Sequence, residues 1–493
     1  MLRTKIVCTL GPSSDDEATI RAFIEAGMAV ARINFSHGTH DDHARRIGLV
    51  RRAAAGMGRV VAVLADLQGP KLRVGALPPE GVTLVEGQTV TLTSQEPPVG
   101  LDALAATEGS PAAQAERAAI PLPHPEVIRD VRPGDRILLD DGLLELKVVD
   151  HNATSLRAQV VTGGVLLSRK GLSLPHTSLQ LPSVTAKDQA DAAFALEQEV
   201  DYFALSFVRC ADDVCHLRDS LTALGSDTPI IAKIEKPEAL DCIEGILVAS
   251  DGLMVARGDL GVEAPAEQVP FAQKLIIRAC NAAGKPAITA TQMLDSMIRN
   301  PRPTRAEASD VANAILDGSD AIMLSGETAM GRYPLAAVQT MARIAAVAEQ
   351  NIPYGDWLQR TMHAASRNVT DAISQVVCEL AAELGAAAII TSTMSGSTAQ
   401  QIARHRPVTP IIAPTPSPKT CRQLALVWGV EPLLVDQFTD TDTMICTAVE
   451  AARGRGLVQD GDLAIITAGV PVGGAGLTNM IKVHHVGEEK GWR

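Results

Sequence analysis

Eight short apolar runs, most of them followed by a segment with helical periodicity, constrain the fold of this chain more than any other feature. Segments such as DEATIRAFIEAG and AKDQADAAFALEQEV carry apolar residues at helical spacing. Strand and helix in alternation predict parallel β/α units, and eight units are enough to close a (β/α)8 barrel, with a doubly wound open sheet as the alternative. The runs are KIVCTLG, AVARINFSHG, VVAVLADLQG, YFALSFVR, IIAKIEK, GLMVARG, AITATQM and AIMLSGET.

Two regions depart from this alternation and predict further domains. Between the third and fourth runs, segments such as DRILLDDGLLELKVVD alternate like strands, while the Pro- and Ala-rich stretch over 96–125 is expected to be a loop. After MARIAAVAEQ, new apolar runs begin, among them AAAIITST and LAIITAG. We therefore expect an α/β protein with a barrel formed by 1–70 and 172–350, an inserted β lid domain over 71–171 and a C-terminal α/β domain over 351–493.

Composition limits the core and the partners. Of the 493 residues, 46% are hydrophobic but only 3% aromatic, so Ala, Val, Leu and Ile must fill the core, as suits helices packed on parallel strands. The formal net charge of -13 argues against a nucleic-acid partner and against an anionic membrane. Any anionic ligand must therefore meet a local basic site, and the absence of a GxxxxGK[ST] motif excludes a P-loop.

Cysteine usage and apolar run length point to the cytoplasm. The closest cysteines, Cys210 and Cys215, lack the spacing of a zinc site, which favours reduced thiols. The apolar stretch at the N-terminus is too short for a signal peptide, and no run reaches the roughly 18 residues of a membrane span. We expect a cytoplasmic protein with no membrane partner.

Charged residues at the ends of two apolar runs predict a metal site. Lys233 and Glu235 stand two residues apart at the end of IIAKIEK, and both point the same way because successive side chains in a strand alternate faces. About two dozen residues later, GLMVARGDLG supplies Asp259. Two carboxylates beside a lysine suit Mg²⁺ or Mn²⁺ bound together with a charged substrate.

Other runs add polar residues by the same period. Arg32, Asn34 and Ser36 share one face of AVARINFSHG, as do Asp66 and Gln68 in VVAVLADLQG. Any one of them could instead be a solvated loop charge or half of a local salt bridge. Their recurrence at successive strand ends favours a single site at the carboxyl ends of the strands, where such barrels carry their chemistry.

Long motifs in this sequence resemble the pyruvate kinase family over nearly the whole chain. They include KIVCTLGPSS, GMAVARINFSHG, IIAKIEKPEAL, SDGLMVARGDLGVE and the stretch from ITATQMLDSM to IMLSGETAMG. The resemblance implies a barrel with a lid domain inserted after its third strand and a C-terminal regulatory domain. It also implies phosphoryl transfer from phosphoenolpyruvate to ADP, which gives pyruvate and ATP.

The resemblance assigns roles to the residues already singled out. Glu235 and Asp259 would hold the divalent metal, and Lys233 would neutralise charge on the transferring phosphoryl group and the departing enolate. Arg257 would be structural, since the backbone of its turn meets the substrate. The remaining implied roles are phosphate orientation by Arg32 and Arg73, substrate carboxylate binding at Ala256, Gly258 and Asp259, proton relay to the enolate carbon by Thr291 and Ser325, and nucleotide binding by Asn34, His37, Arg73 and Lys170.

One departure from many relatives concerns K⁺. Relatives that need K⁺ carry Thr, Lys and Glu where this chain has Leu67, Gln68 and Lys71. Lys71 resembles the K⁺-independent branch, in which an ammonium group replaces the ion. A unit charge about 4 Å from a carboxylate is worth on the order of 4 kcal/mol at an effective dielectric constant near 20. The K⁺ ligands of relatives, here Asn34, Ser36 and Asp66, would then surround the lysine; a hinge-surface lysine is the alternative.

The C-terminal region carries a phosphate-like site of its own. In TMSGSTAQQIARHRP, hydroxyls and free backbone N–H groups precede a helix, although an ordinary helix cap would look the same. The resemblance places an allosteric effector here, at Thr393, Ser395, Gly396, Ser397 and Thr398. The later loop AGVPVGGAGLTN lacks the basic residue of bisphosphate-responsive forms. We therefore expect activation by AMP or a sugar monophosphate.

Two other classes remain open from the residues. A Mg²⁺-dependent lyase or aldolase acting on pyruvate enolates would share Glu235 and Asp259, but would need neither an ADP lid nor an effector domain. A metabolite sensor without catalysis on a degenerate barrel would be favoured by a lost lysine or carboxylate, and none is lost. A homotetramer is implied by the resemblance alone.

Overall fold

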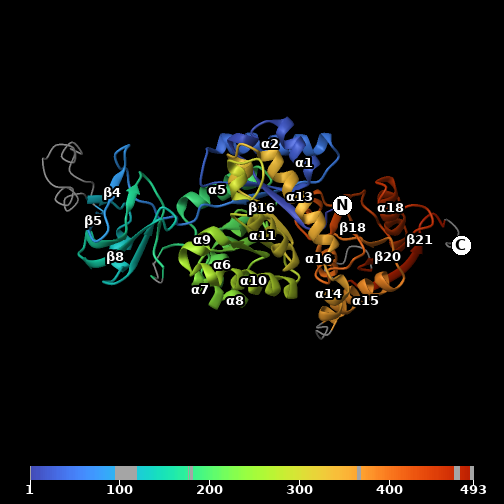
Figure 1. The fold of residues 1–493 in the computed structure, drawn as a ribbon. Coiled ribbons are helices and arrows are strands. Elements are labelled where there is room, and N and C mark those ends of the chain that lie inside the picture. The colour runs from blue at the N-terminus through green and yellow to red at the C-terminus, as the bar shows by residue number, and fades with distance from the viewer. Residues whose placement is uncertain are drawn as a thin grey trace.

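The computed structural model describes residues 2–94, 119–175, 177, 181–362, 368–470 and 478–488. Within them the chain forms three units in a row, with the barrel in the middle, a lid at one end and a C-terminal domain at the other (Figure 1). No helix among the described residues combines the length and the apolar character needed to cross a membrane.

Eight parallel strands in the described part of the chain close the central barrel, which confirms the predicted (β/α)8 fold and rules out the open sheet. Each strand derives from one of the eight apolar runs. In spatial order the strands are β1 (Lys5–Thr9), β16 (Ala321–Leu324), β15 (Ala287–Ala290), β14 (Gly252–Ala256), β13 (Ile230–Ile234), β12 (Tyr202–Leu205), β3 (Ala62–Asp66) and β2 (Met28–Asn34).

Helices surround the barrel, and their ends follow from the sequence. Thr39, Thr185 and Thr304 each accept a hydrogen bond from the backbone N–H three residues on and so begin a helix with a capping box. The helices are α1 (Glu17–Ala26), α2 (His40–Gly56), α5 (Ala186–Glu197), α6 (Ala211–Ala223), α7 (Pro237–Asp241), α8 (Ile243–Ala249), α9 (Arg257–Glu263), α10 (Val269–Ala283), α11 (Arg305–Leu316), α12 (Gly326–Ala329) and α13 (Pro334–Gln350), with short 3-10 helices η1 (Pro12–Ser14), η3 (Ala266–Gln268) and η4 (Asp295–Ile298).

The lid contains a two-stranded and a six-stranded sheet within its described residues. The stretch expected as a loop over 96–125 instead supplies a strand and the start of a helix, because Ile120 is fully buried in the lid core; residues 95–118 lie outside the described residues. The elements are β4 (Val82–Leu84), β5 (Thr89–Thr93), β6 (Ala119–Pro121), α4 (Pro125–Asp130), β7 (Arg136–Leu139), β8 (Leu144–His151), β9 (Ser155–Thr162), β10 (Gly164–Leu166) and β11 (Leu172–Ser173), the last lying just past the expected boundary at 171.

The C-terminal domain is a five-stranded sheet in its described residues, and its last strand is antiparallel. Ala425 and Leu426 of this domain pack into the interior layer of the barrel, and Lys5 at the start of β1 donates to the carbonyl of Val430, so the domain covers the amino ends of the strands. Its elements are α14 (Tyr354–Met362), α15 (Val369–Glu383), β17 (Ala388–Thr391), α16 (Ser397–Ala403), β18 (Ile411–Thr415), α17 (Pro418–Leu424), β19 (Val430–Leu434), α18 (Thr441–Gly454), β20 (Leu463–Ala468) and β21 (Met480–His485).

Candidate functional site

The polar residues at the strand ends continue the interior face of the barrel. Ile231 packs in the apolar interior layer, and Lys233 and Glu235 follow it at intervals of two. The same rule in β2 and β3 puts Arg32, Asn34 and Asp66 on the interior face, with Asn34 level with Asp66 in register and Arg32 level with Leu64. The strand period therefore delivers charged groups to one mouth of the barrel.

Asp66 is the buried centre of this mouth. Its Oδ2 lies 2.6 Å from Arg32 Nε, and its Oδ1 lies 3.2 Å from Lys233 Nζ. Burial alone would raise the pKa of Asp66, but the positive charges of Arg32 and Lys233 outweigh it and hold that pKa below its usual value. Asp66 is thus an anion that orients two cations.

Lys233 joins Asp66 to the expected metal ligand Glu235. Lys233 Nζ lies 2.9 Å from Glu235 Oε1 and donates to Ser206 Oγ at 2.7 Å. Burial would lower the pKa of Lys233, yet Asp66 and Glu235 raise it above the ordinary lysine value. Lys233 is therefore a permanent ammonium, which makes it a source of fixed positive charge and not a base.

Glu235 and Asp259 fit a hard divalent cation. Glu235 Oε2 accepts the backbone N–H of Phe207 at 2.7 Å, which fixes the carboxylate. Burial raises the pKa of Glu235; Lys233 opposes this rise and the negative charge of Asp259 adds to it. No cluster of three or more potential ligand side chains occurs among the described residues, so two carboxylates would leave the other positions to substrate oxygens and water.

Thr291 and Gly258 meet between two neighbouring strand ends. Gly258 donates its backbone N–H to Thr291 Oγ1 at 2.6 Å, and that hydroxyl donates to the carbonyl of Ala290 at 2.7 Å. A Cβ on Gly258 would lie 3.2 Å from Thr291 Oγ1, so glycine permits this close approach. The amide expected at the substrate carboxylate and the hydroxyl expected in proton transfer therefore lie side by side.

Ser325 stands at the end of β16 with its hydroxyl buried and without a hydrogen-bond partner among the described residues. Its backbone N–H donates to Glu327 Oε2 at 2.7 Å, and the other oxygen of Glu327 accepts from Leu294 at 3.0 Å. Burial raises the pKa of Glu327. Glu327 thus ties the segment after Thr291 to the end of β16, a role that the sequence did not reveal.

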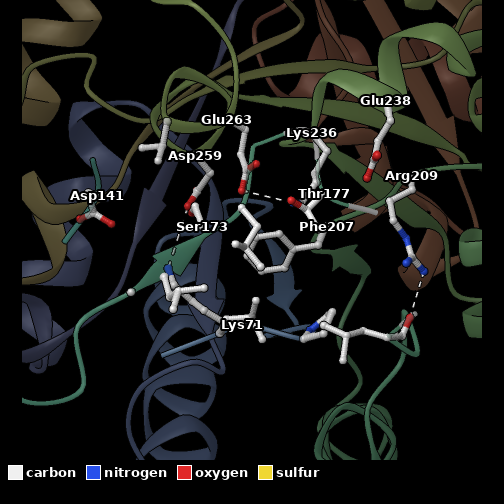
Figure 2. Close-up of a pocket in the computed structure, with 17 residues that line it drawn as sticks. Lys71, Asp141, Ser173, Thr177, Phe207, Arg209, Lys236, Glu238, Asp259 and Glu263 are labelled. Atoms are coloured by element: carbon white, nitrogen blue, oxygen red, sulfur yellow. Dashed lines mark hydrogen bonds and ion pairs between the residues drawn. The ribbon is translucent and has the colours of Figure 1, made fainter. Parts of the chain in front are cut away.

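Lys71 lies at the hinge between barrel and lid. Its Nζ is 4.0 Å from Asp259 Oδ1, and both line a pocket of ≈ 60 Å³ between the two domains. Figure 2 shows Lys71 reaching toward Asp259 on one side of this pocket, with Phe207 in its middle. Among the contacts of the described residues, none joins Lys71 to Asn34, Ser36 or Asp66.

The expected nucleotide residues divide between barrel and lid. Burial lowers the pKa of His37, and the positive charges of Arg73, Lys71 and Arg32 lower it further. Arg73 donates to the carbonyl of Arg169 at 3.1 Å, so its side chain is held by the lid. On the lid, Lys170 Nζ pairs with Asp140 at 2.8 Å, while Asn34 accepts the backbone N–H of Ser36 at 3.1 Å.

Two groups that contact the site were not predicted. Ser206 follows β12 and accepts a hydrogen bond from Lys233 Nζ. In the other strands a polar residue at the end of the apolar run marks the site. The same rule applied to YFALSFVR would have predicted Ser206. Phe207 reaches Glu235 through its backbone N–H, at a φ of 57°, and no side-chain pattern predicts such a contact. Leu67 is fully buried and offers no side-chain ligand.

The expected effector residues lie in the loop before α16. Thr393 Oγ1 accepts the N–H of Gly396 at 2.9 Å, and Thr398 Oγ1 lies 2.9 Å from Thr478 Oγ1. Ser395 is exposed and Ser397 half-buried. Most of the later loop AGVPVGGAGLTN, residues 471–477, lies outside the described residues.

Comparisons with known proteins agree over both halves of the chain. A family model described as "Pyruvate kinase, barrel domain" matches residues 1–338, and one described as "Pyruvate kinase, alpha/beta domain" matches residues 371–484. A pyruvate kinase of Geobacillus stearothermophilus is 49% identical over 489 residues, which cover 99% of this chain and 81% of the relative. One from Clostridium acetobutylicum is 46% identical over 487 residues, 99% of this chain and 100% of the relative.

Proposed function

The chain belongs to the pyruvate kinase family, and we propose that the barrel mouth around Lys233 is where it transfers the phosphoryl group of phosphoenolpyruvate to ADP. The observation that carries this site is the buried Lys233 ammonium held by Asp66 and Glu235 at the carboxyl ends of the strands. The family match gives no support to a lyase or to a sensor without catalysis.

Lys233 and Arg32 would stabilise the negative charge that develops during the reaction. As phosphoryl transfer proceeds, negative charge spreads over the phosphoryl oxygens and the departing enolate oxygen. Lys233 is already ionised and fixed by three partners, so it stabilises that charge without reorganising. Arg32, anchored by Asp66 and by a 2.9 Å hydrogen bond to Thr9 Oγ1, directs its remaining donors to phosphate oxygens.

Glu235 and Asp259 would hold the divalent metal, Mg²⁺ or Mn²⁺, because both ligands are hard oxygens. When bound, the metal would supply positive charge next to the negatively charged reactants. The protein fixes Glu235 beforehand through the N–H of Phe207.

Thr291 and Ser325 would deliver the proton that turns the enolate into pyruvate. Both hydroxyls lie at the ends of adjacent strands, β15 and β16. The Ser325 hydroxyl has no partner among the described residues and is free to orient a water molecule. The Gly258 amide beside Thr291 would receive the substrate carboxylate, together with the backbone at Ala256 and Asp259.

Lys71 would make K⁺ unnecessary. Three carboxylates at the mouth, Asp66, Glu235 and Asp259, face three cations, Arg32, Lys71 and Lys233, so the formal charges cancel without a monovalent ion. Lys71 contributes its positive charge beside Asp259, because Asp66 already has two cationic partners. This arrangement differs from direct replacement of the ion among Asn34, Ser36 and Asp66.

Further properties complete the proposal. ADP would bind between Asn34 and His37 on the barrel and Arg73 and Lys170 on the lid. AMP or a sugar monophosphate would activate the enzyme at the Thr393–Thr398 loop. The enzyme would be a homotetramer. Its eight cysteines form no disulfide among the described residues, which fits the reducing cytoplasm.

Initial-rate kinetics with phosphoenolpyruvate, ADP and Mg²⁺ test the function. We expect ATP and pyruvate to form in equal amounts, which a lyase or a sensor would not produce. Adding AMP, glucose 6-phosphate or fructose 1,6-bisphosphate at subsaturating phosphoenolpyruvate then identifies the effector, and activation by the bisphosphate alone would contradict our assignment.

A further inference from the structure

Arg257 is expected to be structural, yet its side chain contacts the segment that carries Thr291. The guanidinium is almost buried, with 9% of the side chain exposed. Its Nη2 donates to the carbonyl of Thr291 at 2.9 Å and to the sulfur of Met293 at 2.7 Å, and its Nε donates to the carbonyl of Ala290 at 3.4 Å. One side chain therefore contacts three residues, Ala290, Thr291 and Met293, at the end of β15.

The segment needs such support because its backbone is strained. Thr291 and Gln292 have φ values of 66° and 54°, in the left-handed region that a β-branched residue rarely occupies. Each such residue costs roughly 1–3 kcal/mol and persists only when its surroundings fix it. Hydrogen bonds to the carbonyls of Ala290 and Thr291 supply that constraint from one side, while Glu327 holds the N–H of Leu294 from the other.

Arg257 is itself oriented from outside the site. Its Nη1 lies 2.7 Å from Asp310 Oδ2 on α11 and 3.3 Å from Gln273 Oε1 on α10. The next residue, Gly258, donates its N–H to Thr291 Oγ1. Side chain and backbone of the same turn thus fix the main chain and the hydroxyl of Thr291 together.

We propose that Arg257 is a positioning residue, which holds the Thr291 hydroxyl where it exchanges a proton with the enolate carbon, and that Asp310 keeps Arg257 in place. This inference rests on the proposed function, in which Thr291 takes part in proton transfer. In the reverse direction a methyl C–H bond of pyruvate breaks, its electrons form the enolate, and the proton passes to a solvent-exchangeable group.

If Arg257 positions Thr291, its substitution should slow proton transfer selectively. Displacing the Thr291 hydroxyl slows proton transfer more than phosphoryl transfer, because Lys233 and Arg32 are held by Asp66 and not by Arg257. Two rates separate the steps: ATP formation from phosphoenolpyruvate and ADP, and exchange of pyruvate methyl hydrogens into D₂O with Mg²⁺ and inorganic phosphate present, followed by proton NMR.

The test compares Arg257→Lys with a matched control in the full-length enzyme. Arg218→Lys changes an arginine that pairs with Asp251 at the opposite end of β14 and also donates to a backbone carbonyl. We expect Arg257→Lys to slow methyl exchange about 10²-fold and ATP formation about tenfold or less, with the KM for phosphoenolpyruvate nearly unchanged. Arg218→Lys should leave the ratio of the two rates unchanged.

Two further variants make the test decisive. Asp310→Asn should shift the ratio in the same direction by a smaller factor. Arg257→Lys combined with Thr291→Val should exchange no more slowly than Thr291→Val alone, because both changes act through one hydroxyl.

If the effects of Arg257→Lys and Thr291→Val multiply, or if Arg257→Lys leaves the ratio unchanged, the role of Arg257 is overturned while the function stands. A wild-type enzyme that forms no ATP would overturn the proposed function and this inference together.

Discussion

Lys233 Nζ lies 3.2 Å from Asp66 Oδ1, so a lysine of β13 and an aspartate of β3 form a buried ion pair across the strand that separates them. A second carboxylate, Glu235, contacts the same ammonium at 2.9 Å. A buried charge held this way costs free energy to desolvate and contributes little to stability by itself. The proposed phosphoryl transfer gives this buried charge a role at the barrel mouth that stability does not.

Lys233→Met should abolish most of the activity and leave the fold intact. The substitution removes the fixed positive charge at the transferring phosphoryl group, and we expect kcat to fall about 10³-fold or more. Initial rates and far-UV circular dichroism measure the two properties. Lys274 lies on the outer helix α10, where its ammonium pairs with Asp317. Lys274→Met should leave kcat within about twofold. Similar losses in both variants would contradict the role of Lys233.

Glu235→Gln and Asp259→Asn should each weaken metal binding in the absence of turnover. Removing one of two carboxylate ligands lowers the negative charge that holds the cation, so we expect Mn²⁺ affinity to fall by about tenfold or more. Electron paramagnetic resonance of free Mn²⁺ gives the affinity directly. Glu263→Gln alters another buried carboxylate, paired with Lys236 at 3.2 Å, and should leave the affinity unchanged. Unaltered binding in Asp259→Asn would remove it from the ligand set.

The barrel could be predicted from the sequence because its signals are local. Period-two alternation places Arg32, Asp66 and Lys233 on the interior face, and a polar residue after an apolar run marks each strand end. Groups that act through the backbone or through distant side chains leave no such signal. The N–H of Phe207 and the contact of Arg257 with Thr291 depend on which strand ends become neighbours when the barrel closes.

Lys71 shows a different limit of sequence reasoning. The residue type indicates a positive charge that replaces an ion, but a four-carbon side chain at a hinge can reach more than one carboxylate. In the structure it lies beside Asp259, because both oxygens of Asp66 are already occupied by Arg32 and Lys233.

K⁺-free buffer should therefore support near-full activity. Initial rates in tetramethylammonium salts, with and without added K⁺, measure the dependence. Lys71→Glu reverses the charge at this position, and we expect the variant to regain activity only when K⁺ is added. Strong stimulation of the wild type by K⁺ would show that the Lys71 ammonium does not replace the ion.

Acid should destabilise the barrel through His43. Burial lowers the pKa of His43 to about 4, with Arg46 adding to the shift and Asp191 opposing it. Because the folded pKa lies below the unfolded value of about 6.5, this contribution is complete above pH 6.5 and is lost as the pH falls toward 4. The loss at pH 5 is on the order of 2 kcal/mol, and somewhat less after solvent screening.

Chemical denaturation between pH 7 and pH 4.5 measures this loss. His43→Leu removes the titrating group and should flatten the pH dependence of the unfolding free energy. An unchanged slope in His43→Leu would exclude His43 as the source.

Arg406 should matter for the attachment of the C-terminal domain. Its Nη2 donates to Asp320 Oδ2 at 2.9 Å and to Asn281 Oδ1 at 2.6 Å, both in the barrel, and its guanidinium lies 4.8 Å from the centre of the Trp428 ring. Arg406→Met would leave Asp320 buried without its cation, and breaking a buried pair in this way costs about 3–5 kcal/mol. We expect a lower unfolding temperature and earlier proteolysis between the two domains.

Arg404→Met, which breaks the pair with Asp371 inside the C-terminal domain, should lower the unfolding temperature less and leave proteolysis between the domains unchanged. Equal effects of the two substitutions on proteolysis would show that Arg406 does not join the domains.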